Sequence, residues 1–376
     1  MKIDLIGPSY PFRGGISHYT TLLFKYLKEN HTARFYSFKR QYPRFLFPGE
    51  SDKDSSLAPL KENDARPVVD SMNPFSWLRT AAAVIKDKPD ITLFPWWVVF
   101  WAPQFLTVIL FLKLFSKTRI LFVCHNVLEH EGHPLKYLIS KWVLSSGDYF
   151  IVHSEEEKER LVHTIGEREI RVCFHPTYEI FNVGGISQSQ ARAALGIAEE
   201  HVLLFFGFIR DYKGLKYLLK AMPGILTKLD TRLLIAGEIW EGKEFYLKLI
   251  DELELNDKVT IIDRYIRNEE LPHYFCASDL VVLPYVSVTG SGLVQLAFGF
   301  EKPVVVSKIG ALSEVVRDRK TGFLVSPESP SEITEAVVDF FSHCSREDML
   351  GAVKADKGRF AWDTLVKTIA SFVDTS

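Results

Sequence analysis

A pair of glycines, Gly14 and Gly15, stands at the start of an expected helix, shortly after the first apolar run of the chain. Paired glycines let a ligand approach the backbone closely, and they leave N–H groups that suit an anion together with the helix dipole. The spacing differs from G-x-G-x-x-G and so does not support a nicotinamide dinucleotide. A simple tight turn between strand and helix is the alternative.

A second loop of small residues, TGSGLVQ at 289–295, follows the apolar run Leu280–Leu283 and Pro284-Tyr285. Small residues that open a helix again form a cluster of amides able to receive an anion. A single G-x-G has little specificity, but this is the second such loop to follow an apolar run. We therefore expect an anion site here as well.

Two cations stand in a third loop, Gly207–Gly214, directly after the apolar run Val202–Phe206. Arg210 supplies a bidentate fork and Lys213 a point charge, and the two could converge on a diphosphate. A solvated basic turn is the alternative, because that is the commoner state of Arg and Lys in loops.

His125 follows the expected strand Ile120–Val123, where an imidazole could bond a substrate hydroxyl or a developing charge. The alternative is a histidine satisfied within the core. His130, Glu131 and His133 follow closely and invite a metal interpretation. However, H-E-x-x-H is absent and no helix register gathers these side chains, so we predict no metal site.

Short β-rich runs alternate with helical patterns along the chain, which indicates parallel, doubly wound α/β sheets. The expected helices of the first half include Ser17–Lys28, Pro74–Lys86 and Lys136–Ser145. The expected strands are Ile3–Ile6, Phe35–Phe38, Ile91–Phe94, Ile120–Val123, Tyr149–Val152, Val202–Phe206, Arg232–Ala236, Val259–Ile262, Leu280–Leu283, Pro303–Ser307 and Gly322–Val325.

The strands fall into two series, separated by a polar stretch at 179–200 that has the composition of a hinge. We predict two facing Rossmann-like domains with an interdomain cleft, because ligands bind beyond the carboxyl ends of such strands. Residues 39–73 form a long stretch expected to be irregular.

The composition excludes several classes of protein. The 376 residues carry 45 Lys and Arg against 47 Asp and Glu, a net charge of −2 that argues against a globally basic nucleic-acid binder. Four scattered cysteines fit buried thiols in a reducing cytoplasm and exclude a disulfide scaffold. The uncharged run 94–112 could suggest a membrane span, but Pro95 and Pro103 favour a strand, a loop and a buried helix to about Phe115.

Taken together, the motifs resemble the family 4 glycosyltransferases, retaining enzymes of the GT-B fold, over nearly the whole chain. The resemblance rests on their order and spacing: PSYPFRGGISHY, FVCHN, YFIVHSEEEKERL, FHPTYEIF, FFGFIRDYKGLKYLLKAM, LLIAG, LPYVSVTGSGLVQLAFGFEKPVVVSKIGALSEVV, TGFLV and RFAWDTLVKTIASFV. It implies transfer of a sugar from a nucleotide diphosphate donor, with an acceptor-side domain at 1–180, a donor domain at 181–355 and a C-terminal helix at 356–376 that packs on the first domain.

The resemblance also implies roles for single residues. Arg210 and Lys213 match the positive pair that holds the donor diphosphate. His125 matches the residue near the transferred sugar. The backbone that contacts the phosphates would come from Gly14, Gly15, Ser291, Gly292 and Leu293. Such a site needs no metal and no cofactor besides the nucleotide sugar, and the D-x-D at 52–54 is discounted because it does not follow a strand.

The chain departs from the family at one place. Many members carry two glutamates eight positions apart around the loop that corresponds to 289–295, whereas 288–296 contains none. Gln295 lies near the second position, where its amide could bond a ribose hydroxyl, and Thr289 lies near the first. Two alternatives therefore stay open: a sugar-nucleotide epimerase of the same fold, or a non-catalytic nucleotide-sugar-binding protein.

The expected acceptor is a glycan, a lipid-linked sugar or a polysaccharide of the cell envelope, which the resemblance alone suggests. A basic and aromatic segment, SFKRQYPRFLFP at 37–48, contains Lys39, Arg40 and Arg44 and would suit an anionic membrane. Trp96, Trp97 and Trp101 add aromatic rings nearby. The alternatives are a cytoplasmic protein whose rings pack in the core or line an acceptor pocket, and a protein at the inner face of the plasma membrane.

Overall fold

The computed structural model describes residues 1–43, 49, 51–128, 134–287, 290 and 292–374. It divides into two compact units. Unit 1 comprises Met1–Ser55, Pro59–Phe174 and Ala361–Ser376, and unit 2 comprises Ser56–Ala58 and His175–Phe360. Each unit contains its own sheet and its own apolar core.

Unit 1 is built on a seven-stranded sheet in the order β3-β2-β1-β4-β5-β6-β7, with every pair parallel. Its strands are β1 Lys2–Gly7, β2 Thr32–Arg40, β3 Ala65–Asp70, β4 Ile91–Trp96, β5 Arg119–Cys124, β6 Tyr149–Val152 and β7 Glu169–Val172. Its helices are α1 Gly15–Asn30, α2 Pro74–Asp87, α3 Ala102–Phe115, α4 Pro134–Ser145, α5 Glu155–Ile165 and α14 Trp362–Asp374.

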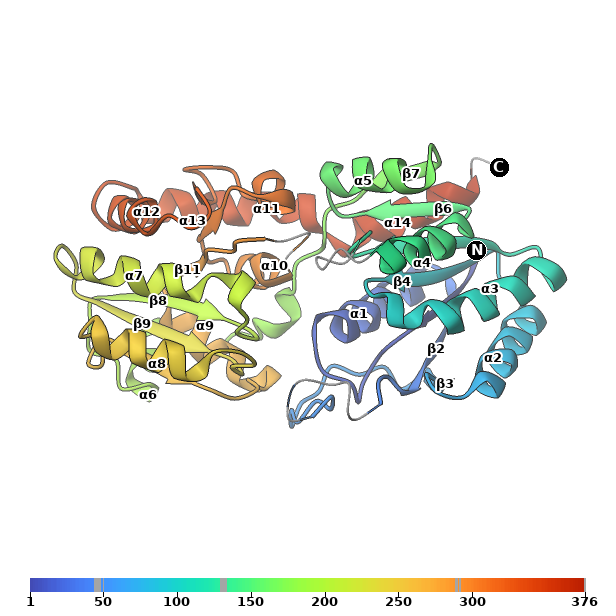
Figure 1. Ribbon diagram of the computed structural model, residues 1–376, viewed down its shortest axis with the longest axis horizontal. Helices are drawn as coiled ribbons and strands as arrows, with labels where there is room; N and C mark the ends of the chain where they lie inside the picture. Colours follow the sequence, from blue (N-terminus) through green and yellow to red (C-terminus); the bar gives the residue numbers. More distant parts are fainter. Residues whose placement is uncertain (44–48, 50, 129–133, 288–289, 291, 375–376) are drawn as a thin grey trace. The chain divides into compact units, whose positions relative to one another are not determined.

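The helices of unit 1 form two groups, as the crossovers of a doubly wound sheet require. Neighbouring helices pack on one another in the series α2, α3, α4 and α5, while α1 packs on the C-terminal helix α14 (Figure 1). The first group covers a large apolar core that includes Phe94, Trp101 and Phe122. The last helix of the chain therefore belongs to the unit in which the chain begins.

Two strands of unit 1 were not expected. β3 lies inside the stretch predicted to be irregular, and β7 follows α5. β3 is an edge strand that contains Pro67, and its register against β2 shifts between Ser37 and Phe38. An edge strand with a proline and several exposed side chains lacks the apolar alternation by which strands are recognised.

The uncharged run 94–112 is divided between a strand and two helices, whereas a strand, an aromatic loop and a buried helix were predicted; α3 is partly exposed, at Leu110 and Leu114 among others. β4 ends at Trp96, the short helix η2 covers Val99–Trp101, and α3 runs from Ala102 to Phe115. Among the described residues, no helix has the length and apolar character needed to cross a bilayer.

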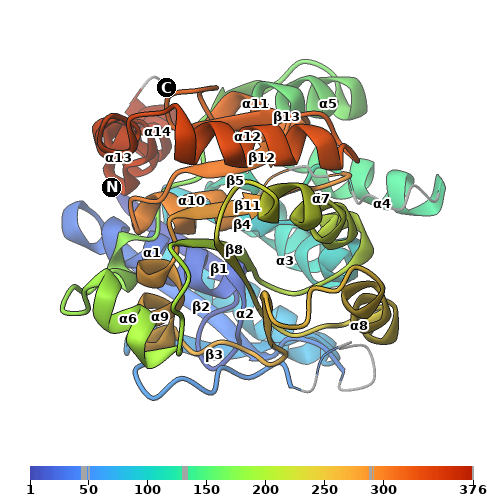
Figure 2. The ribbon, with the colours of Figure 1, turned by 90° about the vertical axis from the view of Figure 1, so that its left-hand side faces the viewer.

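Unit 2 contains a six-stranded parallel sheet in the order β10-β9-β8-β11-β12-β13. Its strands are β8 His201–Phe206, β9 Thr231–Ala236, β10 Val259–Ile262, β11 Leu280–Leu283, β12 Val304–Ser307 and β13 Gly322–Val325. Its helices are α6 Gln188–Ala194, α7 Leu215–Leu226, α8 Lys243–Glu252, α9 Leu271–Ala277, α10 Gly292–Gly299, α11 Gly310–Val315, α12 Pro330–Ser342 and α13 Arg346–Ala355, several of which are visible end-on in Figure 2.

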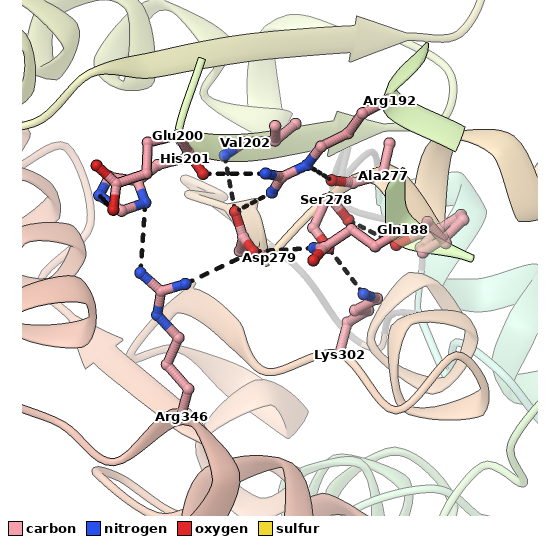
Figure 3. A network of polar contacts seen from close by, with 11 residues as sticks. Gln188, Arg192, Glu200, His201, Val202, Ala277, Ser278, Asp279, Lys302 and Arg346 are labelled. Atoms are coloured by element: carbon pink, nitrogen blue, oxygen red, sulfur yellow. Dashed lines mark hydrogen bonds and ion pairs between the residues drawn. The ribbon is translucent and has the colours of Figure 1, made fainter. Parts of the chain in front are cut away.

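A network of charges centred on Asp279 crosses the amino edge of the unit 2 sheet (Figure 3). Arg192 of α6 bonds the Asp279 carboxylate at 2.7 Å, and the backbone N–H of Val202 donates to the same oxygen at 2.9 Å. Gln188 donates to the other oxygen at 3.0 Å. The side chain of Asp279 is 8% exposed. These residues therefore supply the hydrogen bonds that water would make to an exposed carboxylate.

The first segment of unit 2, at 175–178, packs directly on α10. The N–H of Tyr178 donates to the carbonyl of Gln295, and the N–H of Thr177 donates to the carbonyl of Phe360. A Cβ added to Gly299 would lie 2.8 Å from the backbone carbon of Tyr178. The beginning and the end of the unit thus meet in one backbone hydrogen bond.

Candidate functional site

In each sheet the order in which the strands are added reverses once. At that point the loops that follow two adjacent strands lie side by side. In unit 1 the change lies between β1 and β4, and in unit 2 between β8 and β11. Ligands of open parallel sheets bind at this point, beyond the carboxyl ends of the strands. The loops predicted to bind an anion follow β1, β8 and β11, so each unit presents its glycine-rich loops where a ligand is expected.

In unit 2 the loop after β8 lies against the loop after β11. The N–H of Val286 donates to the carbonyl of Tyr212 at 2.8 Å. Gly214 has φ of 70°, and a Cβ at this position would lie 1.9 Å from the carbonyl oxygen of Pro284. Only glycine allows this approach, which holds the turn of Arg210 and Lys213 next to the start of α10.

Lys213 is buried although it carries a charged group. A Cβ added to Gly207, which has φ of 97°, would lie 3.1 Å from the Nζ of Lys213 and 2.8 Å from the Cδ1 of Leu293. The ammonium group therefore lies close to the beginning of α10. Burial, and secondarily the charge of Arg210, lowers the pKa of Lys213 to about 7, and none of the described carboxylates forms an ion pair with it.

Arg210 lies in the same loop but is more open to solvent. Its Nε is 3.3 Å from the Oε1 of Glu241, and its side chain is 37% exposed. Its guanidinium carbon lies 5.7 Å from the ring centres of both Tyr212 and Trp240. The aromatic flanks hold the stem, and the half-exposed guanidinium keeps N–H groups that a phosphate could engage.

α10 carries Gln295 into the interior of unit 2. The side chain of Gln295 is 1% exposed, and its Oε1 has no hydrogen-bond partner among the described residues. Gly292 and Leu293 form the first turn of α10, while Ser291 and Thr289 lie outside the described residues. A buried amide oxygen without a donor is costly, which is consistent with a partner supplied by a ligand.

Sequence reasoning did not assign a role to His175 and Tyr178, although both belong to the motif FHPTYEIF. A Cβ added to Gly292 would lie 3.6 Å from the ring of Tyr178 and 3.7 Å from the Nε2 of His175. The Tyr178 hydroxyl lies 3.4 Å from that nitrogen, and burial raises the pKa of the phenol. These two side chains border the first turn of α10, where an anion is expected.

In unit 1, Gly14 and Gly15 present open backbone at the start of α1. Gly14 has φ of 105°, and a Cβ at either glycine would contact nothing within 4 Å. The neighbouring loop is braced by residues 52–54: Arg13 N–H donates to the carbonyl of Asp52, and Asp54 N–H donates to that of Pro11. The D-x-D segment thus supports this loop through its backbone.

His125 follows β5, and its N–H donates to the carbonyl of Trp96 at 2.8 Å. Its ring meets the ring of Tyr19 edge-on, with centroids 4.4 Å apart, and that of His153 at 5.1 Å. His153 follows β6 as His125 follows β5. That spacing was a signal in the sequence, within YFIVHSEEEKERL, to which no role was assigned.

The two histidines differ in surroundings. His153 is bonded through Nδ1 to the carbonyl of Cys173 at 2.7 Å, and burial lowers its pKa to about 4, so it is neutral at neutral pH. Beside His125, the N–H of Val127 donates to the carboxylate of Glu157 at 2.6 Å. Burial raises the pKa of Glu157 to about 7. The hydrogen bond from Val127 to Glu157 fixes the loop that carries His125.

Several other expected residues lie apart from these groups or outside the described residues. His130, Glu131, His133 and Arg44 are outside them. Phe38, Trp96 and Trp101 are buried in the core, as the core-packing alternative for these rings expected. Arg40 is bonded to Asp70 through both Nε and Nη2 at 2.8 Å.

Two Rossmann-like units, each with glycine-rich loops at the point where strand order reverses, define the class of GT-B glycosyltransferase folds. Residues 187–352 match the family model of glycosyl transferases group 1. The part of unit 2 that matches this model contains Arg210, Lys213 and α10.

Relatives of known sequence agree with this assignment. The chain is 31% identical over 180 residues to an uncharacterized glycosyltransferase, MJ1607, of Methanocaldococcus jannaschii, covering 47% of this chain and 45% of the relative. It is 33% identical over 199 residues to a D-inositol 3-phosphate glycosyltransferase of a Mycobacterium species (strain JLS), covering 51% and 44%. The match thus spans a little under half the length of these relatives.

Solved structures match the whole chain. Anabaena Alr3699/HepE in complex with UDP-glucose aligns with a TM-score of 0.76 at 16% identity and covers 100% of both chains. A sucrose-phosphate synthase of Thermosynechococcus elongatus aligns with a TM-score of 0.73 at 16% identity, covering 100% of this chain and 99% of the other. These likenesses confirm the fold of two Rossmann-like domains; the cleft between them stays a prediction.

Proposed function

We propose that the protein is a retaining glycosyltransferase that moves a hexosyl group from a nucleotide diphosphate sugar to a glycan, lipid-linked or polysaccharide acceptor. The group 1 domain at 187–352 supports the reaction class. The solved complex of HepE with UDP-glucose supports a nucleotide sugar as donor. Retention, the acceptor and a role in cell-envelope or exopolysaccharide assembly are inferred from the resemblance.

The burial of Lys213 carries the proposal. Burial lowers the pKa of Lys213 to about 7, because the surrounding residues supply too little negative charge to balance its ammonium group. A diphosphate bound beyond β8 and β11 would supply the missing negative charge. Arg210 would add N–H donors, and the first-turn amides at 291–293 would complete the anion site.

The same groups would assist the chemical step. As the bond between the sugar and the diphosphate breaks, negative charge grows on the leaving nucleoside diphosphate. Fixed cations and helix amides stabilise that charge more in the transition state than in the ground state. Lys213 and Arg210 therefore act on the leaving group, and Gln295 would bond the ribose through its buried amide.

Unit 1 would contribute the remaining roles. The open backbone of Gly14 and Gly15 would receive phosphate oxygens of the same donor, and His125 would bond the transferred sugar. The edge-on contact with Tyr19 fixes the plane of the His125 ring. A substitution of His125 by Ala is expected to lower turnover more than donor affinity, and unchanged turnover would contradict the role.

The donor site is tested by calorimetric titration with UDP, GDP and ADP. Lys213→Met should weaken the best-bound diphosphate about tenfold to a hundredfold, since a charge-assisted contact to phosphate is lost. Lys216→Met is the matched control, because Lys216 lies in the first turn of α7, directly after the loop, and its Nζ is 3.1 Å from Oδ1 of Asp211. Equal affinities of Lys213→Met and wild type would overturn the site.

The reaction is tested with a nucleotide sugar chosen among UDP-, GDP- and ADP-sugars as the one that binds best. Transfer to an acceptor with retained configuration supports the proposal, and slow donor hydrolysis without acceptor is consistent with it. Conversion of the nucleotide sugar into its epimer without acceptor would identify the epimerase instead. Binding with neither transfer nor hydrolysis, across envelope glycans and lipid-linked acceptors, would identify a binding protein.

A further inference from the structure

Helices α3 and α4 of unit 1 expose large apolar side chains on their outer side. Their exposed fractions lie between 47% and 64%, and the residues are Leu110, Leu114, Phe115, Leu135, Leu138 and Trp142. We call these six residues the α3–α4 face. The two helices that carry these residues, α3 and α4, pack on each other in unit 1 and are labelled in Figure 1.

The α3–α4 face is not explained by packing within the unit. α3 already buries Phe105, Val108 and Leu112 in the core, and a surface helix normally carries polar residues opposite such a stripe. On α3 the opposite side carries Leu110 and Leu114 instead, at a spacing of four residues. Large apolar side chains exposed together on two packed helices are the kind of feature that marks an interaction surface.

The charged residues of the helices that form and flank the face are mostly basic, although the Nζ of Lys113 lies 3.8 Å from Oδ1 of Asp148. The sequences of α2, α3 and α4 contain a single acidic residue, Asp87, which is buried and bonded to Lys2 and Arg34. The basic residues of these helices are Arg79, Lys86, Lys113, Lys136 and Lys141. In a chain of net charge −2, this is a local concentration of positive charge beside apolar side chains.

From this combination we propose that the α3–α4 face docks on the surface of an anionic lipid bilayer. Leucines, a phenylalanine and a tryptophan would enter the headgroup boundary, and the lysines would contact anionic headgroups. A second copy of the chain fits less well, because two such faces would bring like charges together. α3 has 14 residues, too few to span the hydrocarbon core, so the docking is peripheral.

The proposed surface differs from the segment that the sequence suggested. Of the basic and aromatic residues at 37–43, Phe38 is buried and Arg40 is bonded to Asp70. The exposed apolar residues lie instead on helices whose sequences looked like ordinary elements. The docking also goes beyond the proposed transfer reaction, because it requires neither donor nor acceptor.

The test is flotation of the full chain with vesicles, without nucleotide sugar. Vesicles of one part phosphatidylglycerol to two parts phosphatidylcholine should bind the protein at low salt, and binding should fall as salt is raised. Pure phosphatidylcholine vesicles should bind it far more weakly. Absence of binding to anionic vesicles at low salt would overturn the proposal, as would equal binding to both compositions.

Variants then identify the surface. Leu138→Ser with Trp142→Ser should lower vesicle binding at least about tenfold, and Arg79→Gln or Lys141→Gln should each lower it about fivefold. The control is Phe245→Ser with Leu247→Ser, since these residues of α8 in unit 2 are 51% and 47% exposed. All variants should keep the wild-type melting temperature and diphosphate affinity.

Two results would overturn the assignment of this surface. One is vesicle binding by the Leu138/Trp142 variant that equals wild type. The other is a change from dimer to monomer in that variant with vesicle binding retained, which would make the face a contact between copies of the chain.

Discussion

The two edges of the unit 2 sheet treat buried charge in opposite ways. At the amino edge, Asp279 is held by Arg192, Gln188 and the N–H of Val202 (Figure 3). At the carboxyl edge, Lys213 is buried, but its charged neighbour is Arg210 and its pKa falls to about 7.

The difference separates charges that stabilise the fold from charges that await a ligand. A buried ion with a full set of partners contributes to the cohesion of its elements. A buried ion held beside a like charge costs stability, and such groups cluster at functional sites. The strand ends at which each group lies agree with this division, because ligands bind at the carboxyl edge.

The largest effect is expected at the amino edge. Asp279→Ala should lower the free energy of unfolding by about 3 kcal/mol, because Arg192 loses its buried partner and the N–H of Val202 its acceptor. Urea denaturation measures the change, and Asp257→Ala on the surface of the same unit is the control. A loss equal to that of the control would break the comparison.

At the carboxyl edge, removing the buried charge is expected to raise the free energy of unfolding rather than lower it. Lys213→Met should raise the free energy of unfolding by about 1 to 2 kcal/mol at pH 7. The folded pKa of about 7 lies below the ordinary value of 10.5, so the unfolded chain binds more protons between these values. The stability contributed by Lys213 therefore rises with pH across that window, and the advantage of the variant should shrink by pH 9. A destabilised variant at pH 7 would contradict this account.

The affinity for the donor diphosphate should also depend on the protonation of Lys213. Only protonated Lys213 attracts the diphosphate, and bound anion should raise its pKa above 7. The affinity for the best nucleoside diphosphate should therefore fall as pH rises above 7, by up to about tenfold per unit. Titration calorimetry measures this slope, and Lys213→Met should remove it. A slope that survives in the variant would assign the proton to another group.

The smallest effect concerns Gln295. Gln295→Met should change stability by less than about 1 kcal/mol, because the buried Oε1 has no partner in the described residues to lose. It should weaken nucleoside diphosphate binding about threefold to tenfold and leave inorganic pyrophosphate unaffected. Pyrophosphate lacks the ribose and so serves as the control. Equal losses for both ligands would move Gln295 from the ribose to the phosphates.

Much of the fold could be predicted because most strands of these parallel sheets are short, mainly apolar runs bounded by polar or turn-forming residues. β6, β10, β11 and β13 have the bounds that the sequence suggested. β3 and β7 are the edge strands of the unit 1 sheet, and they were missed because charged residues, and Pro67 in β3, interrupt their apolar pattern. β10 and β13 are the edge strands of the unit 2 sheet, and they were predicted because neither contains a charged residue.

The candidate site could be predicted only in part. The positions of Arg210 and Lys213 after β8 followed from the chain alone. The burial of Lys213 did not, because it depends on Leu293 and on the approach of Gly214 to Pro284, residues about 70 to 80 positions away. The pairing of His125 with His153 depends likewise on adjacent strands, β5 and β6, which periodicity does not reveal.

The packing of residues 175–178 on α10 has a consequence for expression of unit 2 alone. A fragment that began at residue 181 would omit Tyr178, whose backbone lies against Gly299, and Thr177, which bonds Phe360. It would also remove the Tyr178 and His175 side chains that border Gly292, in the first turn of α10. A fragment from His175 to Phe360 would keep both contacts. A fragment of unit 2 should therefore begin a few residues before the polar stretch at 179–200.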